Sequence, residues 1–322
     1  MKIYITRKIP SEGIELLKDA GHEVVVSDKD GVLTREELLS ALKEHNPDAV
    51  IPLLTDKIDA EVFDAAPNAK IFATYSVGYG HIDLDAAKER NVTITNTPGV
   101  LTDSVAEYAV SMICALAKRI PEADAFTRAG KYTGWAPTLL LGSDLKGKTL
   151  GVLGAGRIGS RVAEIMSKGF GMKVAYYDIK ESDFVSKHLG GEFKSTPDEV
   201  LAVADIVTVH VPLLDSTQHL LNAERLALLK STAYLINTSR GPVIDEKALV
   251  EVLKNKKIKG AALDVFEDEP SLADGLTDFK NVILTPHIAS ATEETRGKMS
   301  TMTAENVIAV LGGSIPPNQV GK

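Results

Sequence analysis

Short apolar runs rich in β-branched residues alternate with amphipathic stretches along almost the whole chain. In the first hundred residues these runs predict five strands, at residues 2–6, 22–27, 48–53, 70–75 and 92–95. The stretches between them have the apolar spacing of helices, and Thr34 and Glu37 open one of them with the spacing of a capping box. Strands that alternate with helices indicate βαβ units and a parallel sheet.

A long helical pattern, from Thr102 to about Ile120, separates this series from a second one. Ser104 and Glu107 near its start again have the spacing of a capping box. The second series predicts six strands, at residues 148–153, 173–177, 206–210, 233–237, 260–264 and 282–285. A last helix is expected over roughly 293–313. Two alternating series joined by one long helix predict two α/β domains.

The segment 131–147, KYTGWAPTLLLGSDLKG, follows neither period. It contains the only tryptophan of the chain, Trp135, among leucines, glycines and a proline. A stretch this apolar without clear periodicity is either a covered loop or an exposed contact surface. We favour contact with a second subunit.

The composition narrows the range of partners. The chain has 322 residues, of which 44% are hydrophobic, and its formal net charge of −8 argues against nucleic acid or an anionic membrane as the main partner. The single cysteine, Cys114, excludes an internal disulfide and suits a reducing compartment. No apolar stretch reaches the roughly 18 residues that a membrane span needs. We therefore expect a soluble cytoplasmic protein, and no metal site.

The segment GVLGAGRIGSRVAEI, residues 151–165, carries a G-x-G-x-x-G pattern in Gly154, Gly156 and Gly159. Here the pattern follows an apolar strand and opens an amphipathic helix, and Asp178 ends the next strand, which is the context that a dinucleotide site requires. The glycines permit a tight turn, close approach of a pyrophosphate and close packing of helix on strand. A carboxylate at Asp178 would accept from both ribose hydroxyls and repel a 2′-phosphate, so the sequence predicts NAD rather than NADP.

Ligands of open parallel sheets bind outside the carboxyl ends of the strands, so ionisable residues just past those ends are candidates for chemistry. Arg240 follows one predicted strand in the tight turn NTSRGPVID, and an arginine there suits bidentate capture of a carboxylate. The next strand ends in the acidic run DVFEDEP. We interpret Glu267 and Asp268 as a solvated loop. Asp264 is placed to meet the nicotinamide end of the cofactor, and Glu269 is held extended by the proline after it.

His287 follows the last predicted strand, in LTPHIAS. Most other histidines have structural explanations, although His210 ends a strand near the cofactor and His81 is a secondary candidate in a glycine loop. A lone histidine is more often structural than catalytic. An arginine, a glutamate and a histidine at three strand ends beside one dinucleotide site nevertheless indicate an active site.

Together these residues suit hydride transfer to a 2-keto acid. Hydride addition leaves negative charge on the carbonyl oxygen, and an acid must supply a proton. Histidine, whose ordinary pKa lies near 6.5, can do so near neutral pH, and a neighbouring carboxylate favours its protonated form. Arg240 would fix the substrate carboxylate and polarise the carbonyl.

The segments LGAGRIG, NTSRGPVIDEKAL, GAALDVFEDEP and NVILTPHIAS, in this order, make the chain similar to the D-isomer-specific 2-hydroxyacid dehydrogenases over essentially its whole length. The resemblance implies an α/β fold with two doubly wound domains. A Rossmann-type NAD-binding domain, residues 101–288, would be inserted in a discontinuous flavodoxin-like substrate domain formed by 1–100 and 289–322. Catalysis would then take place in a cleft that closes by a hinge.

The resemblance also implies site residues. Arg240, Glu269 and His287 would form the catalytic trio, with His287 paired to Glu269. In SVGYGHID the backbone amides of Val77 and Gly78 resemble those that bind the substrate carboxylate, although an ordinary turn would need the same glycines. The implied substrate-binding residues are Val77, Gly78, Arg240, His287 and Ser290. The implied cofactor-binding residues are Gly154, Gly156, Arg157, Ile158, Gly159, Asp178, His210, Val211, Pro212, Thr217, Thr238, Asp264 and Ala289.

Within this family, GWAPTLLLGSDLKGKTLG and PHIASATEETRGKMS most resemble the glyoxylate and hydroxypyruvate reductases, which form glycolate and D-glycerate. Asp178 stands where NADPH-preferring members of that group carry no acid, so we expect a preference for NADH. The helix from Thr102 and the Trp135 segment resemble the contact of a homodimer. Arg157 either reaches a cofactor phosphate or is a solvated helix residue.

Two other functions remain open. The same chemistry would serve a D-3-phosphoglycerate or D-lactate type of dehydrogenase, but a phosphorylated substrate needs extra basic residues near 53–80, where only Lys57 and Lys70 stand. A non-enzymatic NAD-sensing protein, like the corepressors of the family, is a different class. The intact trio counts against a loss of catalysis.

Overall fold

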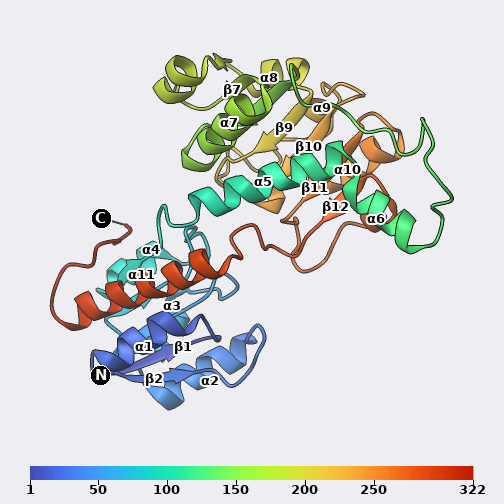
Figure 1. Ribbon diagram of the computed structural model, residues 1–322. Coiled ribbons are helices and arrows are strands. Elements are labelled where there is room, and N and C mark those ends of the chain that lie inside the picture. The colour runs from blue at the N-terminus through green and yellow to red at the C-terminus, as the bar shows by residue number, and fades with distance from the viewer. Residues whose placement is uncertain (322) are drawn as a thin grey trace. The chain divides into compact units, whose positions relative to one another are not determined.

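The computed structural model describes residues 1–321, and the chain divides into two compact units (Figure 1). One unit joins Met1–Leu101 to the chain from Ala291 onward, and the other is Thr102–Ser290. The first unit is therefore discontinuous in sequence, and the second is inserted in it.

The first unit is built on a five-stranded parallel sheet in the order β2-β1-β3-β4-β5. This order is that of the flavodoxin-like fold, in which the chain reverses direction between the second and third strands. Each strand lies within the apolar run that predicted it. The strands are β1 (Lys2–Ile5), β2 (Glu23–Val26), β3 (Ala49–Ile51), β4 (Ile71–Ala73) and β5 (Thr93–Thr95).

Five helices belong to this unit: α1 (Ser11–Asp19), α2 (Arg35–His45), α3 (Ala60–Ala65), α4 (Leu84–Glu89) and α11 (Glu293–Leu311). The predicted capping box opens α2, because the Thr34 side chain accepts from the Glu37 amide and the Glu37 side chain accepts from the Thr34 amide. The last helix, α11, packs beside α1 (Figure 1). The two helices approach closely because Gly13 lies against Ser300 with no room for a Cβ atom.

The second unit holds a seven-stranded parallel sheet in the order β12-β11-β10-β9-β6-β7-β8. This is the Rossmann strand order with one more strand at the β12 edge, and its switch point lies between β6 and β9. The strands are β6 (Thr149–Leu153), β7 (Lys173–Tyr177), β8 (Glu192–Phe193), β9 (Ile206–Val209), β10 (Tyr234–Asn237), β11 (Gly260–Leu263) and β12 (Val282–Leu284). Six of them were predicted, and β8 was missed because two edge residues make no apolar run.

The α-helices of the second unit are α5 (Thr102–Ala117), α6 (Ile120–Arg128), α7 (Arg157–Phe170), α8 (Pro197–Val203), α9 (Ala223–Leu226) and α10 (Glu246–Lys254). Shorter helical turns, labelled η1 to η3, lie at Phe184–His188, Gly241–Val243 and Leu276–Asp278. Helix α5 packs against α7 and against the strands β10, β11 and β12.

Two details of the predicted long helix were wrong. The pattern to Ile120 covers two helices, because Arg119 adopts a left-handed backbone with φ of +56° between α5 and α6. Pro121 lies in the first turn of α6, where its missing N–H has no helical partner to lose. Since α5 begins at Thr102, Ser104 lies inside the first turn and is not the N-cap.

Much of the apolar segment 131–147 is uncovered in a single chain. Tyr132, Trp135 and Leu141 are 57%, 84% and 61% exposed, and α6 beside them contributes no buried residue. The segment is thus a surface feature, as the contact-surface interpretation requires. Across residues 1–321, no helix is both long enough and apolar enough to span a membrane.

Candidate active site

The candidate residues of the second unit follow the carboxyl ends of adjacent strands. Arg240 comes after β10, Asp264 and Glu269 come after β11, and His287 comes after β12. Because these strands are parallel neighbours, the loops that follow them leave the same edge of the sheet. The glycine loop after β6 leaves this edge too. The sheet therefore brings the predicted trio and the predicted dinucleotide loop to one side.

His287 and Glu269 are hydrogen-bonded, with 3.0 Å between Nδ1 of the histidine and Oε2 of the glutamate. The second carboxylate oxygen accepts from the Phe266 amide at 3.0 Å. Burial acts to raise the pKa of Glu269, but the hydrogen bond and charge of His287, the Phe266 amide and the charge of Arg240 together lower it. Glu269 is therefore a carboxylate near neutral pH. It accepts from Nδ1, and Nε2 of His287 is left for another partner.

The loop of His287 is held in an unusual conformation. His287 has φ of +55°, a left-handed backbone that costs a residue with a side chain about 1–2 kcal/mol. Its amide donates to the Asp264 carbonyl at 2.9 Å. The fully buried Asp264 carboxylate accepts from the amides of Ile288 and Ala289 and from the hydroxyl of Thr285, at 2.9, 2.8 and 2.7 Å. Asp264 was predicted to meet the nicotinamide, and the structure shows that both its oxygens hold this loop.

Arg240 begins a tight turn that packs on the loop after β11. Its guanidinium donates through Nη1 to the Ser239 carbonyl at 2.6 Å, and the residue is otherwise exposed. The next residue, Gly241, has no room for a side chain, because a Cβ atom would collide with the Phe266 carbonyl. The arginine turn and the loop of Glu269 therefore support each other. Burial of the guanidinium lowers the pKa of Arg240 and the charge of Glu269 raises it, and a guanidinium beside this pair can bind a small carboxylate.

Neighbouring atoms leave no room for a side chain at two of the three glycines in the loop after β6, whereas the third, Gly156, faces open space. Gly154 has φ of +95°, and a Cβ atom on it would lie 2.8 Å from the backbone of His210. Gly159 leaves no room for a side chain against the Gly154 carbonyl. Gly156 is the N-cap of α7, no side chain caps this helix, and a Cβ atom on Gly156 would meet open space. The free helix N-terminus and the space before it suit a phosphate group.

Asp178 lies directly beside this glycine loop. Its Oδ2 accepts from the Ala155 amide and its Oδ1 from the Ile179 amide, both at 2.7 Å. The carboxylate is thereby fixed beside the glycine loop. Arg157, the first residue of α7, is exposed. Ile158 packs against the apolar core under the helix.

The predicted cofactor residues after β9 line the same edge. His210 lies 2.8 Å through Nε2 from the hydroxyl of Thr208, and burial lowers the pKa of His210 to about 3, so the ring is neutral. Val211 is buried and Pro212 is exposed. The Thr217 hydroxyl donates to the Pro212 carbonyl at 2.6 Å and so closes this loop on itself.

Thr238 gives an independent test of whether a cofactor fits. It follows β10, and its hydroxyl is buried without a hydrogen-bond partner in the part of the chain that is described. An unpaired buried hydroxyl costs about 1–3 kcal/mol, so the group suits a site where a ligand supplies the partner. With the open space at Gly156 and the carboxylate of Asp178, these residues fit a dinucleotide. Ala289 is buried and Ser290 half-buried at the end of the His287 loop.

Val77 and Gly78 lie in the first unit, in the turn after β4. The Val77 carbonyl accepts from the side-chain amide of Asn96 at 2.7 Å, and the Gly78 carbonyl accepts from the Ser76 hydroxyl at 2.6 Å. Within residues 1–321 the backbone amides of Val77 and Gly78 donate to no acceptor. The turn thus presents amides to an anion. His81 lies nearby, with Nε2 3.1 Å from the hydroxyl of Thr74.

The interpretation of Glu267 as a solvated residue was wrong, and sequence reasoning missed its partner Glu246 altogether. The Glu267 carboxylate accepts from the Glu246 amide at 3.2 Å and lies 2.6 Å from Nε2 of His219. Glu246 is only 3% exposed. No spacing in the sequence links Glu246, at the start of α10, to the loop that follows β11. Asp268 is exposed, as expected of a solvated residue.

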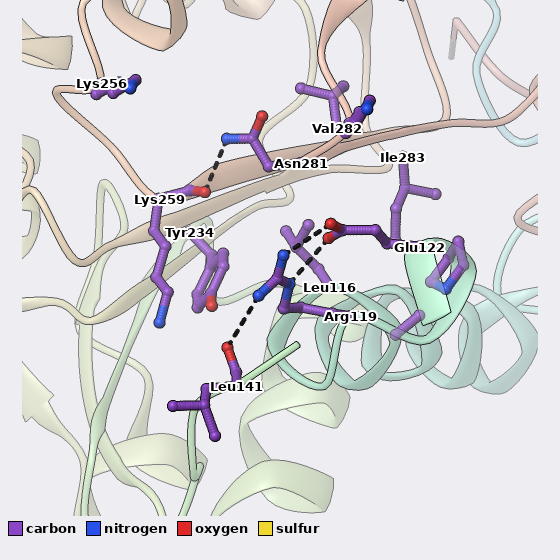
Figure 2. A pocket seen from close by; sticks show the side chains of 13 residues that line it. Leu116, Arg119, Glu122, Leu141, Tyr234, Lys256, Lys259, Asn281, Val282 and Ile283 are labelled. Atoms are coloured by element: carbon purple, nitrogen blue, oxygen red, sulfur yellow. Dashed lines mark hydrogen bonds and ion pairs between the residues drawn. The ribbon is translucent and has the colours of Figure 1, made fainter. Parts of the chain in front are cut away.

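A cavity of the second unit lies elsewhere. It measures about 540 Å³, and Figure 2 shows Arg119 on one wall, bonded to both oxygens of Glu122 and to the Leu141 carbonyl. Tyr234 and Val282, which open β10 and β12, also line it. The cavity therefore lies at the amino ends of the strands, away from the candidate residues, which follow their carboxyl ends.

The chain is similar to known proteins over its whole length. Residues 110–289 match the family described as D-isomer specific 2-hydroxyacid dehydrogenase, NAD binding domain. A glyoxylate reductase of Thermofilum pendens is 50% identical over 100% of this chain and 94% of its own. A protein of Thermus thermophilus with a solved structure is 42% identical, with a TM-score of 0.94 and 100% of both chains covered. An NADPH-dependent glyoxylate/hydroxypyruvate reductase of Sinorhizobium meliloti, solved with NADP and malonate, is 32% identical, with a TM-score of 0.85 over 99% of this chain and 96% of that one.

Proposed function

Because the chain belongs to the D-isomer-specific 2-hydroxyacid dehydrogenases, we propose that it reduces glyoxylate to glycolate and hydroxypyruvate to D-glycerate. The family makes it an oxidoreductase with a nicotinamide cofactor and a small-molecule substrate. The observation that carries the proposal is the bonded pair of His287 and Glu269 at the sheet edge that also carries the dinucleotide loop. The names of the similar proteins support the choice of keto acid.

Each residue of the trio has a distinct part in this reaction. The bound coenzyme supplies the hydride that the keto carbon accepts. His287 donates a proton from Nε2 to the carbonyl oxygen as negative charge develops there. The Glu269 carboxylate, bonded to Nδ1, orients the ring and stabilises its protonated form. Arg240 binds the substrate carboxylate and places a second N–H beside the carbonyl oxygen.

We assign the remaining contacts as the sequence predicted them. The amides of Val77 and Gly78 are our candidates for a further contact with the substrate carboxylate. The glycine loop and the N-terminus of α7 would hold the pyrophosphate, and Thr238 would meet the coenzyme with its unpaired hydroxyl. Asp264 would contribute to cofactor binding through the loop that it holds.

We propose that NADH is preferred over NADPH because of Asp178. A carboxylate anchored by two backbone amides cannot swing away, so a 2′-phosphate would meet an uncompensated negative charge. The Asp178→Ala variant should lose much of the preference in kcat/KM for NADH over NADPH. An unchanged cofactor ratio would contradict the role of this residue.

We also propose that two copies of the chain pair through the segment 131–147 and helix α6. The side chains of Trp135 and Leu141 are exposed in the single chain, and contact with a second copy would cover them. Sedimentation of the wild type should give the mass of a dimer, and Trp135→Glu should shift it toward a monomer. A monomeric wild type would refute this assembly.

The central test is turnover. NADH oxidation should be followed with glyoxylate, hydroxypyruvate, pyruvate and phosphohydroxypyruvate under identical conditions. We expect the highest kcat/KM with the first two. A higher value with pyruvate or with the phosphorylated acid would move the assignment to another member of the family, and no turnover with any of them would refute it.

A further inference from the structure

One buried carboxylate spans the loop that carries Glu269. Glu246, the first residue of α10, is 3% exposed. One of its oxygens accepts from the Glu267 amide at 2.7 Å, and the other accepts from the Ala273 amide at 3.3 Å. These amides lie on either side of Glu269 in the chain. A single side chain of a neighbouring helix therefore holds the loop at both of its ends.

The loop is tied back to α10 in return. The Glu267 carboxylate accepts from the Glu246 amide at 3.2 Å and lies 2.6 Å from Nε2 of His219. The His219 amide donates to the Pro242 carbonyl at 2.8 Å, within the turn that follows Arg240. Glu246, Glu267 and His219 thus connect the loop of the proposed catalytic glutamate to the turn of the proposed catalytic arginine.

The helix itself does not need Glu246. Its N-cap is Asp245, whose side chain accepts from the Ala248 amide at 2.9 Å. Burial raises the pKa of Glu246, the amides of Glu267 and Ala273 lower it, and the negative charges of Glu267 and Asp268 raise it further. An acid buried beside other acids opposes stability unless its hydrogen bonds compensate. Helix capping is thus already served, and the bonds of Glu246 go to the loop.

We propose that Glu246 is a positioning residue for Glu269. By holding the amides of residues 267 and 273, it keeps the Glu269 carboxylate against Nδ1 of His287. This inference rests on the proposed function, because it assumes that the pair of Glu269 and His287 supplies the proton. A loosened loop would weaken the protonated form of His287. Arg240 would still bind substrate, because the side-chain amide of Asn237 donates to the Arg240 carbonyl at 2.9 Å and holds that turn on β10.

Two variants and one matched control test this inference. Glu246→Ala removes both hydrogen bonds, whereas Glu246→Gln keeps an oxygen for one amide and turns an N–H toward the other. The control is Glu251→Gln, because Glu251 is exposed on the same helix and its carboxylate lies 3.6 Å from the Lys254 ammonium. Each variant is assayed for kcat, KM, coenzyme affinity and thermal stability.

We expect kcat to fall about tenfold in Glu246→Ala and less in Glu246→Gln, with KM for the keto acid changed less than about twofold. The alkaline limb of the kcat/KM profile should move to lower pH in the same order. The Glu269 carboxylate would lie farther from His287 in the variants and would stabilise the protonated ring less. Coenzyme affinity and the Glu251→Gln control should match the wild type. Lower thermal stability with normal kcat and an unmoved pH profile would overturn the proposal.

A measurement without substrate separates this inference from the proposed function. The ring of His287 is titrated by NMR in the wild type and in Glu246→Gln, the milder of the two variants. A shift of the titration to lower pH supports the positioning role even if none of the tested keto acids is reduced. An unchanged titration overturns it, even if the wild type reduces glyoxylate.

Discussion

Replacing Asp264 by Asn tests how the loop of His287 is held. The change keeps the size of the side chain but removes one of two negatively charged acceptors. In the native protein these oxygens receive the Thr285 hydroxyl and the amides of Ile288 and Ala289, at distances between 2.7 and 2.9 Å. An asparagine that keeps its oxygen toward the Thr285 hydroxyl and the Ile288 amide must turn its NH₂ toward the Ala289 amide. One buried hydrogen bond is then replaced by two donors that face each other.

The expected loss of stability follows from these contacts. A hydrogen bond to a charged group contributes about 1.5–3 kcal/mol, and an unpaired buried donor costs about 1–3 kcal/mol more. Relaxation of the left-handed backbone at His287 would return about 1–2 kcal/mol. The middle values of these ranges give a net loss of about 2–3 kcal/mol. For a unit that spans 102–290, this corresponds to a Tm lower by roughly 4–12 °C.

Calorimetry without coenzyme at pH 7 measures the Tm, and NADH oxidation measures kcat. The control is Asp268→Asn, since Asp268 is an exposed acid in the loop that follows the same strand. We expect kcat of Asp264→Asn to fall at least about tenfold, because a relaxed backbone misplaces the imidazole. A Tm and a kcat equal to those of the control would refute the view that Asp264 holds this loop.

Three further changes address individual groups. His287→Asn should lower kcat by at least about a hundredfold, and a near-normal kcat would remove it as the acid. Arg240→Ala should raise KM and lower kcat together, because the guanidinium serves both bound substrate and transition state; a change in KM alone would limit it to binding. Burial lowers the pKa of His210 to about 3 in the folded protein. Between pH 6.5 and 3 this histidine is therefore protonated in the unfolded chain but not in the folded one, so the free energy of unfolding falls as the pH drops. His210→Gln should therefore lose less stability than the wild type between pH 6.5 and 5, by about 1–2 kcal/mol in urea titrations, and equal losses would contradict this origin.

The strand ends could be predicted from the sequence because a parallel sheet imposes them. A run buried on both faces must be apolar, so the polar residue that follows it marks where the chain leaves the sheet. Arg240 and His287 were found in this way, and β10 and β12 place them as the pattern indicated. The bond between His287 and Glu269 was expected only from the family resemblance, because no periodicity connects two different loops.

Helix breaks and edge strands could not be predicted, because they depend on single backbone angles and on neighbours. The pattern from Thr102 to Ile120 is helical throughout, and only the left-handed φ of Arg119 divides it. The edge strand β8 pairs with β7 although its residues form no apolar run. Pro121 is a local signal beside the first of these features, whereas the pairing of β8 depends on a strand distant in the chain, which local composition does not encode.

The acidic run after β11 shows where sequence reasoning reaches its limit. Asp264, Glu267, Asp268 and Glu269 carry the same charge within six residues, yet the structure gives them different surroundings. Asp264 accepts from amides of the next loop, Glu267 from α10, and Glu269 from His287, while Asp268 faces water. What separates them is which backbone amides lie opposite each carboxylate, and those amides belong to segments distant in sequence. The prediction of a solvated side chain is correct for Asp268 and wrong for Glu267. Each acid of such a run beside a predicted strand end should therefore be tested separately.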